Sequence, residues 1–472
     1  MSAALVLLAL VLAGLAVATL ASWRLGLGLF VAWMLVEDLP RKYLGNNMAV
    51  FFGKDLLLAL VYAGFLLALR HGRVRPWRPP FLLPLAALVA LGIAQVFNPA
   101  SPSPWYGVMG VKLDFYYAGL AVVGHAALRD ARDLRRALVA FAAAAGVIGA
   151  LGLAQGIVGL DFLNPEALAP ELLALGREVR YSPLTQAVVP RATSVFVSEA
   201  RYGAFMVLAY IVTAGAALDA ARRAHPVRWA LMALAGLALT AVAMHGSRGG
   251  ILYATLSTLV LGVAVPATAG AEGRRRLRAP ALVGLASVLA LTLALLLAFP
   301  RDVAARWALY AESLSPWSPR SELAYRLWAY PVANIRDAVA TGTGLLGQGL
   351  GTASIGAYYV AASLGVPAPT YAGESGIGTL LLELGILGPL LWVAWAGVLV
   401  REGARVAWRL RGGPAGALAM AIAWFAFLLL FPITYGALNP YQNYTTNALF
   451  WLLVGVLFRL PSLPDGEARD DR

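Results

Sequence analysis

The sequence predicts an all-α, polytopic bundle of membrane helices, from its composition, its apolar runs and its arginine placement. Of the 472 residues, 60% are hydrophobic and only 13% are charged, whereas a soluble domain has about 25% charged residues. The mean hydropathy of +0.73 excludes a soluble enzyme, a disordered chain and a nucleic-acid-binding module. The absence of cysteine and the presence of only four histidines exclude disulfides and thiolate metal sites and disfavour a histidine-rich one.

A helix needs about 20 apolar residues to cross a bilayer, and thirteen runs approach that length. They lie at 3–21, 25–36, 55–69, 81–97, 108–128, 137–160, 201–221, 229–244, 250–269, 280–299, 376–400, 415–432 and 446–460. The first two runs are short and closely spaced, so we expect 12–13 transmembrane helices. They form a single transmembrane domain over 1–460, which includes large outer loops at 161–200 and 300–375, and a charged tail follows at 461–472.

Arginine predicts the orientation of these helices. Nineteen arginines fall in five short segments, at 70–78, 129–136, 222–228, 274–278 and 401–411. Cytoplasmic loops are enriched in Lys and Arg, so these segments and the C-terminus are expected in the cytoplasm. Much of the net charge of +13 thus serves to orient the chain, and no nucleic-acid partner is expected.

A second group of arginines lies on the outer side, where orientation does not require positive charge. These are Arg191, Arg201, Arg248, Arg320 and Arg326. Several converging guanidinium groups suit a diphosphate, because their planar fork makes two-point contacts with phosphate oxygens. The alternatives are contacts with phospholipid head groups, or ion pairs with Glu199, Glu312 or Glu322.

Glu374 is a candidate general base, because it lies where the outer loop 300–375 re-enters the membrane. A carboxylate there can accept a proton from a sugar hydroxyl. The alternative is a charge that only favours the dipole at the start of a helix. Glu383, nine residues further on, is expected to be structural.

Two further motifs are interpreted as structural. Residues 342–347 spell a GxGxxG motif between membrane helices, where a tight turn is expected rather than a dinucleotide site. Glu37-Asp38 could hold a divalent metal, but nearby Arg41, Lys42 and Lys54 favour ion pairing. We therefore expect no metal and no cofactor.

Four stretches resemble motifs of the bacterial O-antigen polymerase and O-antigen ligase family of membrane glycosyltransferases. They are an arginine-containing outer segment (190–196), an Arg-x3-Leu motif (247–252), a glycine-rich turn (346–351) and Glu374-Ser375 followed, after nine residues, by a Gly-x-x-Gly at 385–388. Ligases of the family carry histidine where this chain has Glu374. The resemblance therefore favours a polymerase or a related exopolysaccharide enzyme.

The resemblance implies a GT-C-like fold with a large helical outer loop, in the bacterial inner membrane. It also implies a metal-independent, inverting transfer of an undecaprenyl-diphosphate-linked oligosaccharide to a lipid-linked glycan acceptor at the periplasmic face. In that picture Arg191 and Arg248 hold the diphosphate, Arg248 being catalytic because it neutralises the leaving group. Arg320 or Arg326 completes the clamp, and Glu374 is the catalytic base. The alternatives are a ligase acting on lipid A-core or another acceptor, and a flippase for the lipid-linked oligosaccharide.

Overall fold

The computed structural model describes residues 3–164, 178–341, 346–366 and 374–464. The chain is 76% helical with almost no strands, which confirms the predicted helical class. Within the described residues, seven helices are long and apolar enough to cross a membrane, and four shorter apolar helices accompany them. The expected 12–13 crossings stay a prediction.

The described N-terminal part consists of seven α-helices and one short 3-10 helix, and one predicted span is interrupted near its middle. Its elements are α1 (Ala3–Ala21), α2 (Trp23–Val36), α3 (Asp38–Tyr43), α4 (Met48–Arg70), α5 (Leu82–Gln95), α6 (Pro104–Asp114), η1 (Tyr116–Gly119) and α7 (Leu120–Ala127). The span expected at 108–128 is therefore two helices joined by a short turn. Helix α6 ends at Asp114, whose backbone oxygen accepts a hydrogen bond from the Tyr441 hydroxyl at 3.0 Å.

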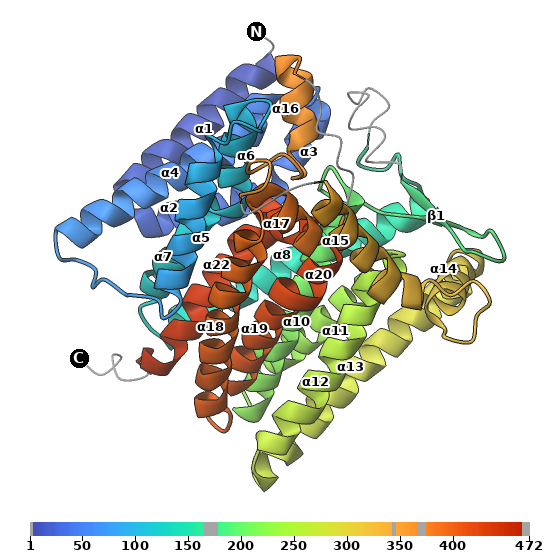
Figure 1. The fold of residues 1–472 in the computed structure, drawn as a ribbon. Helices are drawn as coiled ribbons and strands as arrows, with labels where there is room; N and C mark the ends of the chain where they lie inside the picture. Colours follow the sequence, from blue (N-terminus) through green and yellow to red (C-terminus); the bar gives the residue numbers. More distant parts are fainter. Residues whose placement is uncertain (1–2, 165–177, 342–345, 367–373, 465–472) are drawn as a thin grey trace.

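The middle of the chain forms long helices around α10 (Figure 1). It comprises α8 (Ala131–Val158), a hairpin of β1 (Val179–Tyr181) and β2 (Val188–Pro190), α10 (Glu199–Arg222), α11 (Arg228–Met244), α12 (Arg248–Thr268), α13 (Ala271–Ala298) and α14 (Pro300–Leu314). Helix α10 is the most deeply buried of the seven long apolar helices and packs against α8, α11, α12, α19 and α22.

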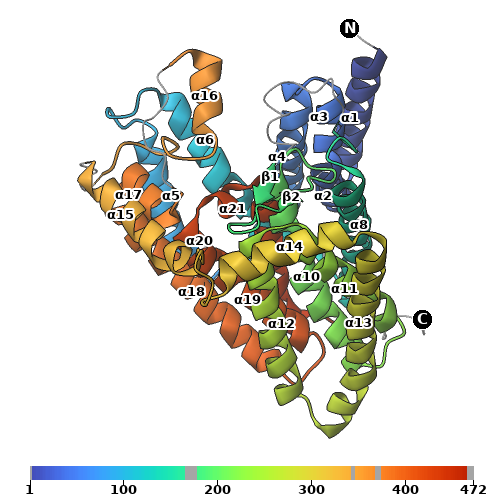
Figure 2. The ribbon, with the colours of Figure 1, turned by 90° about the vertical axis from the view of Figure 1, so that its right-hand side faces the viewer.

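The C-terminal part contains several broken helices. Its elements are η2 (Tyr325–Ala329), α15 (Tyr330–Ala340), α16 (Ala357–Leu364), α17 (Gly376–Leu384), α18 (Leu387–Leu410), α19 (Gly416–Leu428), η3 (Leu429–Ile433), α20 (Thr434–Gly436), α21 (Asn439–Gln442), α22 (Tyr444–Arg459) and η4 (Leu460–Ser462). The span expected at 376–400 is divided at Gly385, whose φ of +66° is a backbone conformation that favours glycine. Figure 2 shows α5, α6 and α15–α18 on one side and α1–α4 on the other, with α20 and α21 between them.

Contacts gather the five arginine-bearing segments at one end of the bundle. Arg222 donates to the backbone oxygen of Arg411 at 2.9 Å, and Arg276 donates to that of Arg222 at 3.3 Å. The other contacts are Ala131 N–H to Pro464 O at 3.2 Å and Trp77 to Phe458, with ring centroids 5.5 Å apart. A small cavity lined by parts of α8, α10 and η4 connects the two groups. We call this the arginine-rich end.

Candidate functional site

One cavity, of about 400 Å³, contains four of the five side chains to which the sequence analysis gives a role in binding or catalysis. They are Arg191, Arg248, Arg326 and Glu374. The β1–β2 hairpin, the first turn of α12, η2, the start of α15 and Glu374, two residues before α17, contribute to it. Its charged lining residues are Arg180, Arg191, Arg248, Glu322, Arg326 and Glu374. Arg320 is exposed and is not among the lining residues. Arginines outnumber glutamates four to two in this lining, and Glu178 and Glu199 behind it pair with Arg180 and Arg191.

Arg248 stands at the first position of α12, with the helix N-terminus facing the cavity. The side chain of Ser247 caps the helix by accepting from the Gly250 N–H at 3.1 Å. Gly246, with φ +79°, turns the chain beside Val189, where an added Cβ would come within 2.6 Å of a side-chain carbon. Because a helix N-terminus carries a partial positive charge, this turn adds to the attraction of anions.

Glu322 and Glu374 connect the arginines of this cavity. Glu322 forms an ion pair with Arg248 and lies 3.6 Å from Nε of Arg326. Nη1 of Arg326 in turn lies 3.3 Å from Oε2 of Glu374. Both side chains of this last pair are about half exposed, at 44% and 54%. The pair is accessible from solvent, and its charges can exchange one partner for another.

Arg191 is held more rigidly, by two carboxylates. Its Nη1 lies 2.5 Å from Glu199 and 3.1 Å from Glu178, and only 9% of the side chain is exposed. Glu178 also pairs with Arg180 at 2.7 Å. Sequence reasoning missed Arg180. The Glu-x-Arg spacing at 178–180 could have indicated this ion pair, because residues two apart in an extended segment lie on the same face.

Two of the expected ion-pair alternatives are present and one is not. Arg191 pairs with Glu199 and Arg248 pairs with Glu322, as expected for internal neutralisation. Glu312 instead accepts from the backbone N–H groups of Leu184 and Thr185, at 2.7 and 3.2 Å. It therefore anchors the hairpin tip to α14.

Hydrogen bonds between side chains and the backbone position Glu374 just before the start of α17. The side-chain oxygen of Asn334 accepts from the N–H groups of Glu374 and Ser375, at 2.7 and 3.2 Å. Ser375 caps α17 and donates to the backbone oxygen of Tyr435 at 3.0 Å. Burial and the carboxylate of Glu374 raise the pKa of Tyr330, so this phenol remains protonated in the cavity.

The acidic pair Glu37-Asp38 lies in a buried ion network. Lys54 pairs with Glu37 at 2.9 Å, and Asp38 pairs with Arg41 at 3.5 Å and with Arg201. Arg201 therefore stabilises this buried network and does not line the cavity. Among the described residues, no three His, Asp or Glu side chains lie together in a group that could hold a metal ion.

Glu383 and the glycine-rich turn serve the packing of α17. Glu383 is buried and accepts from the Ala353 N–H at 2.8 Å. The N–H of Gln348 donates to Leu382 O at 2.7 Å, which satisfies a carbonyl at the end of α17. Residues 342–345 of the GxGxxG motif lie outside the described residues.

A larger, mostly apolar cavity adjoins the charged one. It has a volume of about 650 Å³, lies among α11, α12, α13 and α14, and shares Leu252 and Leu314 with the arginine-lined cavity. Arg306, which also lines it, donates to the backbone oxygens of Met244, Asp302 and Gly156. Charged groups and space for a hydrocarbon chain therefore lie side by side.

This arrangement can bind an anion that carries an apolar chain, and it offers an accessible carboxylate beside that anion. Such a combination suits transfer of a group from a lipid diphosphate. No protein-family model matches the chain, and no curated protein matches it.

Proposed function

We propose that this protein is a membrane glycosyltransferase of the O-antigen polymerase type. It transfers an undecaprenyl-diphosphate-linked oligosaccharide to a sugar hydroxyl of a lipid-linked acceptor glycan. The observation that carries the proposal is the single cavity in which Arg180, Arg191, Arg248 and Arg326 accompany Glu374. The GT-C-like arrangement with 12–13 crossings belongs to the same proposal.

The arginines of the cavity bind the donor diphosphate. Arg326, which is exposed, and Arg248, which is partly buried, both contact Glu322 and are the two that exchange it for phosphate oxygens. Arg191 and Arg180 contribute positive potential from the hairpin. Since charge grows on the leaving diphosphate as the sugar–oxygen bond breaks, these cations stabilise the transition state more than the ground state.

Glu374 is the general base in this mechanism. The acceptor hydroxyl attacks the anomeric carbon of the donor from the face opposite the diphosphate and transfers its proton to the Glu374 carboxylate. The new carbon–oxygen bond forms as the bond to the diphosphate breaks, and the electron pair remains on the diphosphate. The products are a glycan with inverted anomeric configuration and undecaprenyl diphosphate.

The adjoining apolar cavity suits the polyprenyl chain of the donor. Its lining meets the arginine cavity at Leu252 and Leu314, so a head group and its chain can occupy both at once. The two lipid substrates then keep their chains in the bilayer while their head groups meet. Because cytoplasmic segments are enriched in arginine, the proposal places the arginine-rich end at the cytoplasmic face of the bacterial inner membrane and the arginine-lined cavity at the periplasmic face.

Reconstitution tests the proposal. The full chain in lipid vesicles receives a synthetic polyprenyl-diphosphate oligosaccharide, and we expect free polyprenyl diphosphate and longer lipid-linked glycans in equal amounts. Transfer only to added lipid A-core identifies a ligase instead. Movement of intact donor across the bilayer without release of diphosphate identifies a flippase and overturns the proposal.

A further inference from the structure

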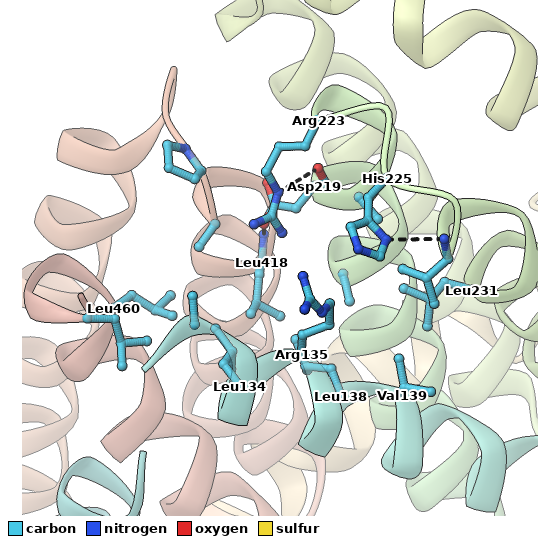
Figure 3. Close-up of a pocket in the computed structure, with 17 residues that line it drawn as sticks. Leu134, Arg135, Leu138, Val139, Asp219, Arg223, His225, Leu231, Leu418 and Leu460 are labelled. Carbon is cyan, nitrogen blue, oxygen red and sulfur yellow. Dashed lines mark hydrogen bonds between the residues drawn. The ribbon is translucent and has the colours of Figure 1, made fainter. Parts of the chain in front are cut away.

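A second cationic site lies at the arginine-rich end, far from the cavity described above. A cavity of about 80 Å³ opens there between α8, α10, α11, the α18–α19 connection and η4. Figure 3 shows the side chains of Arg135, Arg223 and His225 turned toward one another over a set of leucines. The volume suits a phosphate-sized group.

The two arginines of this cavity are accessible to a ligand. Arg135 and Arg223 are exposed, and no carboxylate in the described part of the chain forms an ion pair with either of them. Burial lowers the pKa of His225, and Arg135, Arg223 and Arg228 lower it further. The imidazole is therefore neutral near pH 7 among cations that repel one another, an arrangement that an anion would relieve.

The one carboxylate that lines the cavity is committed to the fold. Asp219 is buried, and its two oxygens accept from the backbone N–H groups of Ala417 and Leu418, at 2.9 and 2.8 Å. It caps the start of α19. Arg223 contacts the backbone oxygen of Asp219 at 3.4 Å, so its remaining guanidinium N–H groups are free for another acceptor.

The floor of the cavity is apolar. Leucines from four helices and from the residue after η4 form it, namely Leu134, Leu138, Leu231, Leu418, Leu460 and Leu463. A free inorganic anion would gain nothing from these side chains, whereas a phospholipid pairs a phosphate with hydrocarbon. Basic pockets between membrane helices on the cytoplasmic side bind anionic lipid head groups.

We propose that this cavity binds the head group of an anionic phospholipid, with Arg135 and Arg223 contacting its phosphate and the leucines contacting its hydrocarbon. The bound lipid connects α8, α10 and the α18–α19 connection. This site is independent of the proposed glycosyl transfer.

Lipid titration followed by native mass spectrometry tests the site. We expect the purified full chain to bind phosphatidylglycerol in preference to phosphatidylcholine, and the Arg135→Ala/Arg223→Ala variant to bind it about tenfold more weakly, as expected for lost charge-assisted contacts. Both residues are exposed, so the variant should fold. The matched control Arg275→Ala/Arg278→Ala removes two exposed arginines outside the cavity and should bind as the wild type does.

Three outcomes would overturn the proposal. Equal weakening in both double variants would mean a general effect of charge. Competition by inorganic phosphate as effective as that by phosphatidylglycerol would mean that a soluble anion is the ligand. If lipid binds only when residues 465–472 are removed, the acidic tail and not a lipid is the occupant of the cavity in the full chain.

Discussion

Arg326 and Glu374 form an ion pair in which Nη1 lies 3.3 Å from Oε2. A member of the proposed diphosphate clamp is thus paired with the proposed base. Both side chains are about half exposed, and an exposed pair contributes only about 0–1 kcal/mol. In the proposed mechanism, a donor diphosphate that recruits Arg326 releases Glu374 toward the acceptor, so that donor binding prepares the base.

Arg326 and Arg320 offer a comparison within the same outer loop. We expect Arg326→Ala to raise the donor KM about tenfold or more, since a hydrogen bond to a charged group contributes roughly 1.5–3 kcal/mol. Arg320→Ala should leave the KM within about twofold, because Arg320 does not line the cavity. Initial rates over a donor concentration series measure both. Equal effects of the two substitutions would contradict the assignment of Arg326 to the clamp.

In the proposed mechanism, Glu322 competes with the donor for the arginines. It pairs with Arg248 and lies 3.6 Å from Arg326, so we expect Glu322→Gln to bind a short-chain polyprenyl diphosphate about three- to tenfold more tightly, consistent with the value of an exposed pair. Isothermal titration calorimetry measures the Kd. Glu402→Gln, at the arginine-rich end where Glu402 pairs with Arg401 and Arg405, is the matched control and should bind as the wild type does. Weaker binding by Glu322→Gln would show that Glu322 supports the site.

Asn334 is a positioning residue for Glu374. Its side-chain oxygen accepts from the N–H groups of Glu374 and Ser375, so Asn334→Ala should lower kcat by about 10- to 100-fold, with little change in donor KM, because misplacement of a catalytic group is costly. Asn334→Asp keeps an acceptor oxygen and should restore most of the activity. An Asn334→Asp variant as slow as Asn334→Ala would point to a packing role.

Metal chelation should leave turnover unchanged. Glu37 and Asp38, the buried acidic pair at the junction of α2 and α3, form ion pairs with Lys54, Arg41 and Arg201. Turnover is measured with and without EDTA at equal ionic strength. Activity that disappears with EDTA and returns with Mn²⁺ would make this pair a metal site.

The sequence predicted the helical class and four residues of the cavity, because hydropathy and arginines outside the five arginine-bearing segments are local signals. The caps that Ser247 and Ser375 form at the starts of α12 and α17 were not predicted. The division of the span at 376–400 depends on Gly385, whose backbone conformation a hydropathy window does not register.

The role of Asn334 and the commitment of Arg201 could not be predicted. Both depend on contacts between segments far apart in the chain, as in the hydrogen bond from Glu374 to Asn334 and the ion pair of Arg201 with Asp38. Arg320 and Arg326 looked equivalent in sequence, and only the path of the chain between α14 and α15 separates them. Arg180 depends on the register of a short hairpin.

The comparison of Glu374→Gln with Arg248→Ala tests the central claim most directly. Donor binding and glycan transfer are measured on each purified variant. If Glu374 is the base and Arg248 holds the diphosphate, Glu374→Gln binds the donor with wild-type affinity and loses transfer, whereas Arg248→Ala binds the donor at least about tenfold more weakly. Wild-type rates of transfer in both variants would contradict the claim.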